Sequence, residues 1–158
     1  MQILRVSNAP TIISNVMVGL ALAIQSHNIE YSHLMNSPPL DFIKPICIVS
    51  TLLLGIYFAG MILNDAIDVG LDNKRRPERP IPQGIITAKT AWSTGLCLLA
   101  ASILISLRIN MGTLLATCLL SVCVLVYTYL HHRVLPAIFL MGVCRALVYV
   151  TAFTAFFS

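Results

Sequence analysis

Long apolar segments separated by short polar ones dominate the chain. The segments that are nearly free of charge have about the length, roughly 20 residues, that a helix needs to cross a bilayer. They cover residues 6–29, 45–63, 90–107, 109–130 and 134–158. Because lipid cannot hydrogen-bond a backbone, and because the period-2 alternation of barrel strands is absent from the sequence, these segments are predicted to be helices. The pattern predicts one domain over residues 1–158, an all-α polytopic transmembrane helical bundle of about five transmembrane helices.

Composition agrees with a protein that is integral to a membrane. Of the 158 residues, 58% are hydrophobic and 10% are charged, and the mean hydropathy is +0.87. The net charge of +4 belongs mostly to loops beside lipid headgroups, and with no soluble basic module we expect no nucleic-acid partner. The five cysteines fall in predicted spans without Cys-x-x-Cys spacing, which favours packing over metal or redox roles.

The cations are distributed unequally between the two ends of the predicted spans. Under the positive-inside rule the richer end, with the amino terminus and the loop at 64–89, is predicted to be cytoplasmic. The poorer end carries Lys44 and Arg108. The richer end carries Arg5, Lys74, Arg75, Arg76, Arg79, Lys89 and Arg133.

One segment, "NDAIDVGLDNKRRPERPIPQG" at 64–84, concentrates charge in this otherwise apolar chain. Asn64, Asp68 and Asp72 recur at i, i+4 and i+8, and they share one face if the preceding helix continues through them. Asp65 lies about a quarter-turn away. Mutual repulsion and the helix dipole disfavour acidic side chains at a helix carboxyl end, so a compensating cation is expected. Magnesium, which prefers oxygen ligands, is the natural candidate.

The cations that follow are suited to phosphate. Lys74, Arg75, Arg76 and Arg79 come directly after the acidic residues, and the arginine fork matches phosphate oxygens. Gly84 and Thr87 are predicted to form a turn and the amino-terminal cap of a helix that begins near Ala88. The alternative is a solvated loop in which the aspartates neutralise nearby cations. That alternative explains the charges but not the i, i+4, i+8 register.

"NDAIDVGLD" followed by "RRPERPIPQG" resembles the first aspartate-rich motif of the UbiA superfamily of intramembrane prenyltransferases. The resemblance implies that Asn64, Asp68 and Asp72 bind Mg²⁺ with Asp65 in support, and that the following cations hold the diphosphate of a polyprenyl donor. It further implies ionisation of the donor to an allylic carbocation, which an aromatic or other lipid-soluble acceptor attacks. Under this resemblance the chain is an enzyme, a membrane-embedded prenyltransferase, and it corresponds to the amino-terminal half of the family fold.

Weaker resemblances extend along the chain and suggest pocket residues. "LRVSNAPTIISNVMVGLAL" is similar to the first helix of the family, where Asn8 and Asn15 are candidates for lining the pocket or for helix-to-helix hydrogen bonds. "YTYLHHRVLP" at 127–136 is similar to a family segment with a tyrosine and a basic pair, with His132 in place of the usual lysine. It adds Tyr127 and Arg133 as candidates, although tyrosine at the end of a span is commonly interfacial.

Arg145 is the one charge placed deep in a predicted span. An intramembrane arginine is costly, and it is a functional candidate for that reason. Two interpretations stay open. Arg145 is either a buried partner for a backbone carbonyl or an aspartate, or a contact to a substrate oxygen.

The second acidic motif of catalytic family members has no counterpart in this chain. The six acidic residues are Glu30, Asp41, Asp65, Asp68, Asp72 and Glu78. The chain therefore looks truncated relative to the family: a fragment, a half completed by a homodimer or a complementing subunit, or a non-catalytic protein that binds isoprenoid diphosphates or acts as a scaffold or carrier. A CDP-alcohol phosphotransferase is excluded because its Asp-Gly-x-x-Ala-Arg run is missing.

Overall fold

A computed structural model describes residues 9–26, 39–131 and 134–156, and within these residues every regular element is a helix. The predicted all-α class is therefore confirmed. The helices are α1 (Ala9–Ser26), α3 (Pro39–Ile67), α4 (Val69–Arg75), α5 (Ala88–Ser106), α6 (Met111–Leu130) and α7 (Val134–Phe156).

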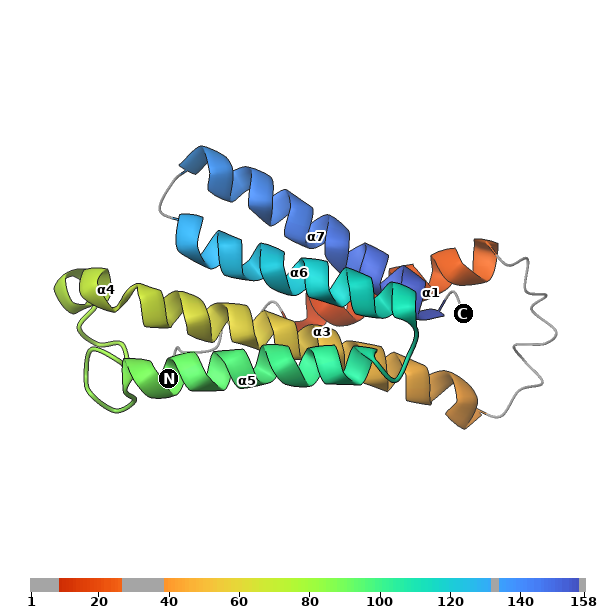
Figure 1. Cartoon of the computed structure of the whole chain (residues 1–158), viewed down its shortest axis with the longest axis horizontal. Helices are drawn as coiled ribbons and strands as arrows, with labels where there is room; N and C mark the ends of the chain where they lie inside the picture. The colour runs from red at the N-terminus through yellow and green to blue at the C-terminus, as the bar shows by residue number, and fades with distance from the viewer. Residues whose placement is uncertain (1–8, 27–38, 132–133, 157–158) are drawn as a thin grey trace.

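The long helices form an elongated bundle, with the short α4 at one tip (Figure 1). In the described part of the chain, α3, α5, α6 and α7 are long and apolar enough to cross a membrane, and α1 adds a shorter apolar helix. This agrees with a bundle of about five spans. The second helix extends beyond the predicted 45–63 at both ends, and Pro45 lies inside it. Pro39 stands at its first position, where a missing N–H leaves no hydrogen bond unmade.

Helix α3 is the centre of the bundle, because it packs against α1, α5, α6 and α7. Small residues let its neighbours approach closely. A Cβ added to Gly95 of α5 would lie 2.6 Å from Leu63 Cγ, and one added to Gly55 of α3 would lie 2.6 Å from Ser102 Oγ. Such close packing is what holds helices together in lipid, where the hydrophobic effect between helices is lost.

Two hydrogen bonds fasten neighbouring helices across the core. Ser102 Oγ of α5 donates to the Leu52 carbonyl of α3 at 3.1 Å. Asn110 caps α6 by accepting from the Thr113 N–H at 2.7 Å, and its side-chain amide donates to the Thr154 carbonyl of α7 at 2.9 Å. The first bond joins α5 to α3, and the second joins the start of α6 to the end of α7.

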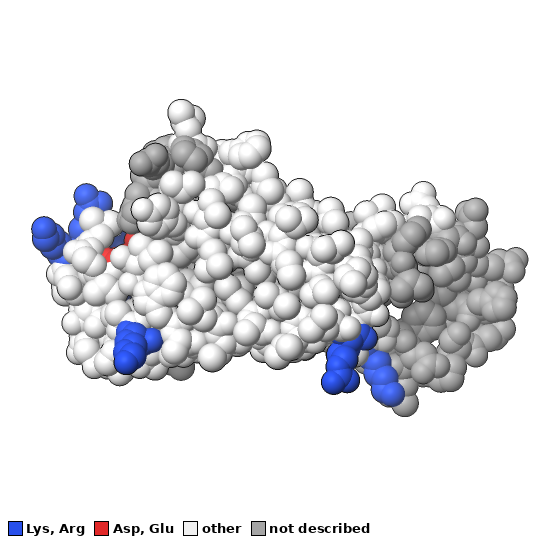
Figure 2. Space-filling model, viewed as in Figure 1, with Lys and Arg blue, Asp and Glu red and all other residues white. Residues whose placement is uncertain are grey.

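Charge is confined to the two ends of the bundle on the face that Figure 2 shows, and the flank between them is free of Lys, Arg, Asp and Glu. Lys44, near the start of α3, and Arg108, between α5 and α6, belong to one end. The cations of residues 74–89 belong to the other, where α4 and the following loop lie. The apolar middle and charged ends are those of a membrane-spanning bundle.

Candidate functional site

The acidic motif begins at the end of α3 and runs through a one-residue irregularity. Helix α3 ends at Ile67, Asp68 adopts φ −74° and ψ −1°, and α4 follows at once. The Asp68 N–H donates to the Asn64 carbonyl at 2.9 Å, and the Asp68 carbonyl accepts from the N–H groups of both Leu71 and Asp72. The backbone thus stays nearly helical, but Asp68 and Asp72 take different side-chain partners.

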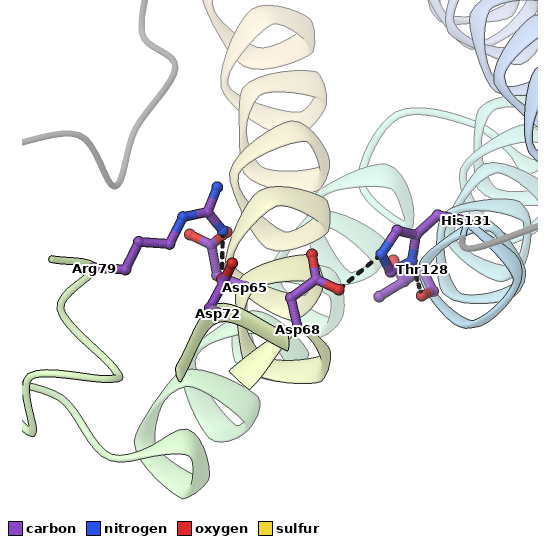
Figure 3. A network of polar contacts seen from close by, with 6 residues as sticks. All are labelled: Asp65, Asp68, Asp72, Arg79, Thr128 and His131. Atoms are coloured by element: carbon purple, nitrogen blue, oxygen red, sulfur yellow. Dashed lines mark hydrogen bonds and ion pairs between the residues drawn. The ribbon is translucent and has the colours of Figure 1, made fainter. Parts of the chain in front are cut away.

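Asp72 and Asp65 share one cation, Arg79. A single guanidinium nitrogen, Nη1, donates to Asp72 Oδ2 at 2.7 Å and to Asp65 Oδ1 at 2.9 Å. The Asp72 side chain is only 6% exposed, and a carboxylate so buried requires a paired charge. Arg79 comes from the loop between α4 and α5, so this contact closes the loop onto the end of α3 (Figure 3).

Asp68 instead contacts His131, the residue that follows α6. His131 Nε2 lies 2.9 Å from Asp68 Oδ1, and Nδ1 lies 2.6 Å from the Thr128 carbonyl oxygen. Both partners are acceptors, so the two hydrogen bonds form together only when both ring nitrogens carry hydrogen. The sequence prediction missed His131, although it directly precedes the basic pair that was singled out at 132–133.

Asn64 supplies an oxygen that has no partner. Its Oδ1 is buried and makes no hydrogen bond to the described residues, an arrangement that is disfavoured unless another group binds there. An amide oxygen beside carboxylates suits Mg²⁺, so the donor set fits the predicted ion. Within the described ranges, however, no three His, Cys, Asp or Glu side chains converge tightly enough to hold a metal. Asp68 and Asp72 were predicted to share one helix face, but their carboxylates do not converge on one point in the structure.

Two cavities adjoin these residues, and Asp72 lines both. The larger, of about 240 Å³, has Asp65, Asp72 and Arg79 at its polar part. Its remaining lining is mainly apolar: Ile62, Pro80, Ile81, Pro82, Ile86, Ala91 and Thr94. The smaller, of about 180 Å³, is lined by one apolar residue, Leu71, and by Asp68, Asp72, Arg75, Arg76 and His131.

The remaining candidates are spread over the bundle. Lys74, Arg75 and Arg76 are exposed, and of these only the two arginines line a cavity. Tyr127 is half-buried, with its ring centre 6.3 Å from that of His131. Asn15 is buried in α1. Asn8 and Arg133, with His132, lie outside the described residues.

Arg145 makes neither of the contacts expected for it among the residues that the structure describes. It stands at the midpoint of α7, its side chain is exposed, and it forms no hydrogen bond or ion pair there. Within the described residues Arg145 does not contact the acidic cluster, whereas Arg79 and His131 do.

Comparisons with known proteins agree with one another. The chain matches the UbiA prenyltransferase family over residues 16–158. It is 44% identical over 52 residues to a digeranylgeranylglyceryl phosphate synthase of Methanosarcina mazei, covering 33% of this chain and 18% of that protein. The protein of the same name from Pyrococcus horikoshii is 36% identical over 76 residues, 46% of this chain and 27% of that one.

A solved structure that concerns digeranylgeranylglyceryl phosphate synthase in membranes has the same fold, with a TM-score of 0.76 at 22% identity. The likeness covers 96% of this chain and 50% of that chain. The chain therefore spans about half the length of that structure, and its matches to the two curated relatives span about a quarter or less of theirs. The family match nevertheless extends over most of the chain, and this protein belongs to the UbiA prenyltransferase family.

Proposed function

We propose that this chain supplies the donor-binding half of a membrane-embedded prenyltransferase. It would bind a polyprenyl diphosphate with Mg²⁺ and deliver the prenyl group to an aromatic or other lipid-soluble acceptor. The observation that carries this proposal is the buried, unpartnered Oδ1 of Asn64 beside the carboxylates of Asp65, Asp68 and Asp72. An acceptor atom left unsatisfied next to acidic side chains is what a metal-binding site without its metal would contain.

The smaller cavity has the chemistry of a diphosphate site. Asp68 and Asp72 supply carboxylate oxygens there, Arg75 and Arg76 supply hydrogen-bond donors, and His131 lines the cavity beside Asp68. Arginine binds phosphate oxygens through its planar fork. When bound, Mg²⁺ would neutralise the diphosphate and so stabilise it as a leaving group. Asn64, Asp68 and Asp72, with Asp65 in support, are the residues that would hold the ion.

The larger cavity suits the first part of a prenyl chain. Apolar side chains from α3, α5 and the loop between α4 and α5 face a space whose polar part is formed by Asp65, Asp72 and Arg79. A prenyl diphosphate requires this same adjacency of an apolar wall and a charged end. Asp72, which lines both cavities, would stand near the bond that breaks.

The orientation and the partners follow from the charges and from the length of the chain. The excess of cations at the α4 end favours a cytoplasmic position for the motif. The likeness covers half of the solved relative, and we propose that the remaining wall of the cavity and the surface for the acceptor come from a longer form of this chain, a second copy or a complementing subunit. The donor-binding residues proposed above are the same in each case.

The test is a titration of the detergent-purified chain with geranylgeranyl diphosphate, with and without Mg²⁺, combined with an assay for diphosphate release. We expect Mg²⁺-dependent binding that Asp68→Ala weakens at least roughly tenfold, because hydrogen bonds and ligand bonds to charged groups are worth about 1.5–3 kcal/mol. Glu78→Ala is the matched control, because this substitution removes the same charge from the same segment at a side chain that is exposed. Unchanged affinity in Asp68→Ala would refute the metal assignment.

A non-catalytic protein that binds or carries isoprenoid diphosphates is the second candidate. It is favoured by one observation, that within the described ranges no three His, Cys, Asp or Glu side chains converge tightly enough to hold a metal. The same assay separates the two candidates. Release of diphosphate with turnover would eliminate the carrier, whereas Mg²⁺-dependent binding without release would support it.

A further inference from the structure

We infer that Arg79 competes with the metal: its guanidinium occupies the position between Asp65 and Asp72 that a bridging cation would take, and it moves to the diphosphate when the metal binds. This inference rests on the proposed function and goes further, because it assigns an order to the binding events. It makes Arg79 a residue with two alternative partners, where the sequence indicates only a phosphate ligand.

The geometry of the contact is that of a cation held by two carboxylates. Asp65 Oδ1 and Asp72 Oδ2 come from different turns, yet both converge on the same nitrogen, Nη1, at 2.9 and 2.7 Å. Magnesium binds oxygen at about 2.0–2.1 Å. An ion that bridged the same two oxygens would overlap Nη1, so the guanidinium and the metal exclude each other.

The Arg79 guanidinium also makes fewer hydrogen bonds than it could in its present position. Only Nη1 makes hydrogen bonds, and within the described residues Nη2 and Nε make none. A guanidinium binds most strongly when two of its nitrogens form parallel bonds to one oxyanion. The diphosphate offers such a partner, and the Asp65–Asp72 pair does not. When the donor binds, hydrogen bonds from Arg79 to the diphosphate would therefore replace those that it loses to Asp65 and Asp72.

The loop lets the side chain move while its backbone stays in place. The Arg79 N–H donates to the Arg76 carbonyl at 3.1 Å, and its own carbonyl accepts from the Gln83 N–H at 3.0 Å. Pro77 and Pro80 flank these bonds and restrict the backbone further. The side chain is 24% exposed, so it has open space on one side. Rotation about its side-chain bonds is enough to carry the guanidinium away from Asp72.

This exchange predicts that metal and diphosphate bind cooperatively. Without diphosphate, a metal ion must displace Arg79 and leave it without a partner. With diphosphate present, the displaced guanidinium gains a better one. By linkage, each ligand must then raise the affinity of the other by the same factor. Removing the Arg79 charge should raise the affinity for metal alone and reduce the cooperativity.

The experiment measures Mn²⁺ binding to the detergent-purified chain from the electron paramagnetic resonance signal of free Mn²⁺, with and without inorganic diphosphate. We expect Arg79→Gln to bind Mn²⁺ alone roughly tenfold more tightly than the wild type, within the usual range of coupling effects. Lys89→Gln is the matched control, because it removes the same charge at the same end of the bundle, where Lys89 is exposed and contacts neither carboxylate. We expect at most a small change there.

A second variant keeps the buried Asp72 paired and so protects the test against misfolding. Arg79→Lys retains the charge but lacks the fork. It should bind Mn²⁺ alone about as weakly as the wild type and should lose most of the enhancement by diphosphate. Equal Mn²⁺ affinity in the wild type and Arg79→Gln, or equal gains in Arg79→Gln and Lys89→Gln, would overturn the inference while leaving the proposed metal site intact. Absence of Mn²⁺ binding in all forms would overturn the proposed function, and the inference with it.

Discussion

At the scale of single residues, the acidic cluster is divided between two partners in the described part of the chain, Arg79 and His131. Asp72 and Asp65 contact Arg79, and Asp68 contacts His131 from the opposite side of the chain (Figure 3). The two partners come from separate parts of the sequence, one from the loop after α4 and one from the end of α6. The three aspartates are therefore held at this end of the bundle by contacts from two different segments.

His131 is expected to position Asp68. Removing its ring in His131→Ala should weaken Mg²⁺-dependent binding of geranylgeranyl diphosphate roughly tenfold, since a hydrogen bond to a charged group is worth about 1.5–3 kcal/mol. His131→Gln, which can still donate to Asp68, should restore part of this affinity. Binding without Mg²⁺ and the melting temperature should change little, and both are measured in the same preparations.

The matched control is Tyr129→Ala at the same end of α6, where the side chain is 78% exposed. If His131→Ala and Tyr129→Ala lower the affinity equally, the effect belongs to the helix end and not to the contact with Asp68. If Mg²⁺-free binding falls as much as Mg²⁺-dependent binding, His131 acts on the donor and not through Asp68.

The sequence predicted which residue types meet at this site but not how they pair. Asn64, Asp65, Asp68 and Asp72 are close in the chain, so their presence at one helix end is a local property. The pairing of Asp68 with His131 joins residues 63 positions apart, and it depends on how α6 packs against α3. Periodicity carries no information about such a contact. The irregularity at Asp68 is equally invisible in the i, i+4, i+8 register.

At the scale of helices, the local signals at the start of α5 are confirmed. Thr87 caps the helix by accepting from the Thr90 N–H at 3.1 Å, and Gly84 has a φ of +73°, which favours glycine. Both features are set by a few neighbouring residues, which is why sequence alone reveals them. The close approach of α5 to α3 is different, because it requires Gly95 to face Leu63 across two helices.

Gly95 of α5 lies against Leu63 of α3, the residue that precedes Asn64. We expect Gly95→Ala to destabilise the packing of α5 against α3 next to the acidic motif. The new Cβ would lie 2.6 Å from Leu63 Cγ, and overpacking of this kind typically costs about 1–3 kcal/mol. Gly142→Ala in α7 is the same substitution in open space, where the gain in helix propensity should stabilise by up to about 1 kcal/mol. Thermal unfolding in detergent should therefore shift in opposite directions. Equal shifts would mean that α5 does not pack tightly against α3 in solution.

At the scale of the whole molecule, α7 presents an apolar stripe to the outside. Leu135, Phe139 and Met141 are 83%, 74% and 59% exposed, and α7 is the least buried of the candidate spans in the described chain. Exposed apolar side chains are ordinary where lipid covers them. Arg145 is the exception within this stripe, since it stands at the midpoint of α7, far from both ends.

The cost of Arg145 depends on what covers the stripe. If lipid does, Arg145→Leu should increase the fraction of chains whose α7 inserts into a membrane, because an arginine at a span centre costs about 2.5–3.5 kcal/mol on insertion scales. We expect this increase for the chain expressed alone, measured with a glycosylation reporter placed after α7. Arg108→Leu is the control: the same substitution at the end of the bundle, where the guanidinium reaches water and its removal should change insertion little.

The opposite result would be equally informative about the architecture. A fall in insertion for Arg145→Leu would mean that the guanidinium has an oxygen partner outside the described residues, since none within them bonds to it. Such a partner at mid-membrane depth must belong to protein, because a lipid phosphate lies about 15 Å away at the edge of a hydrocarbon core roughly 30 Å thick. The stripe on α7 would then contact protein and not lipid at the depth of Arg145.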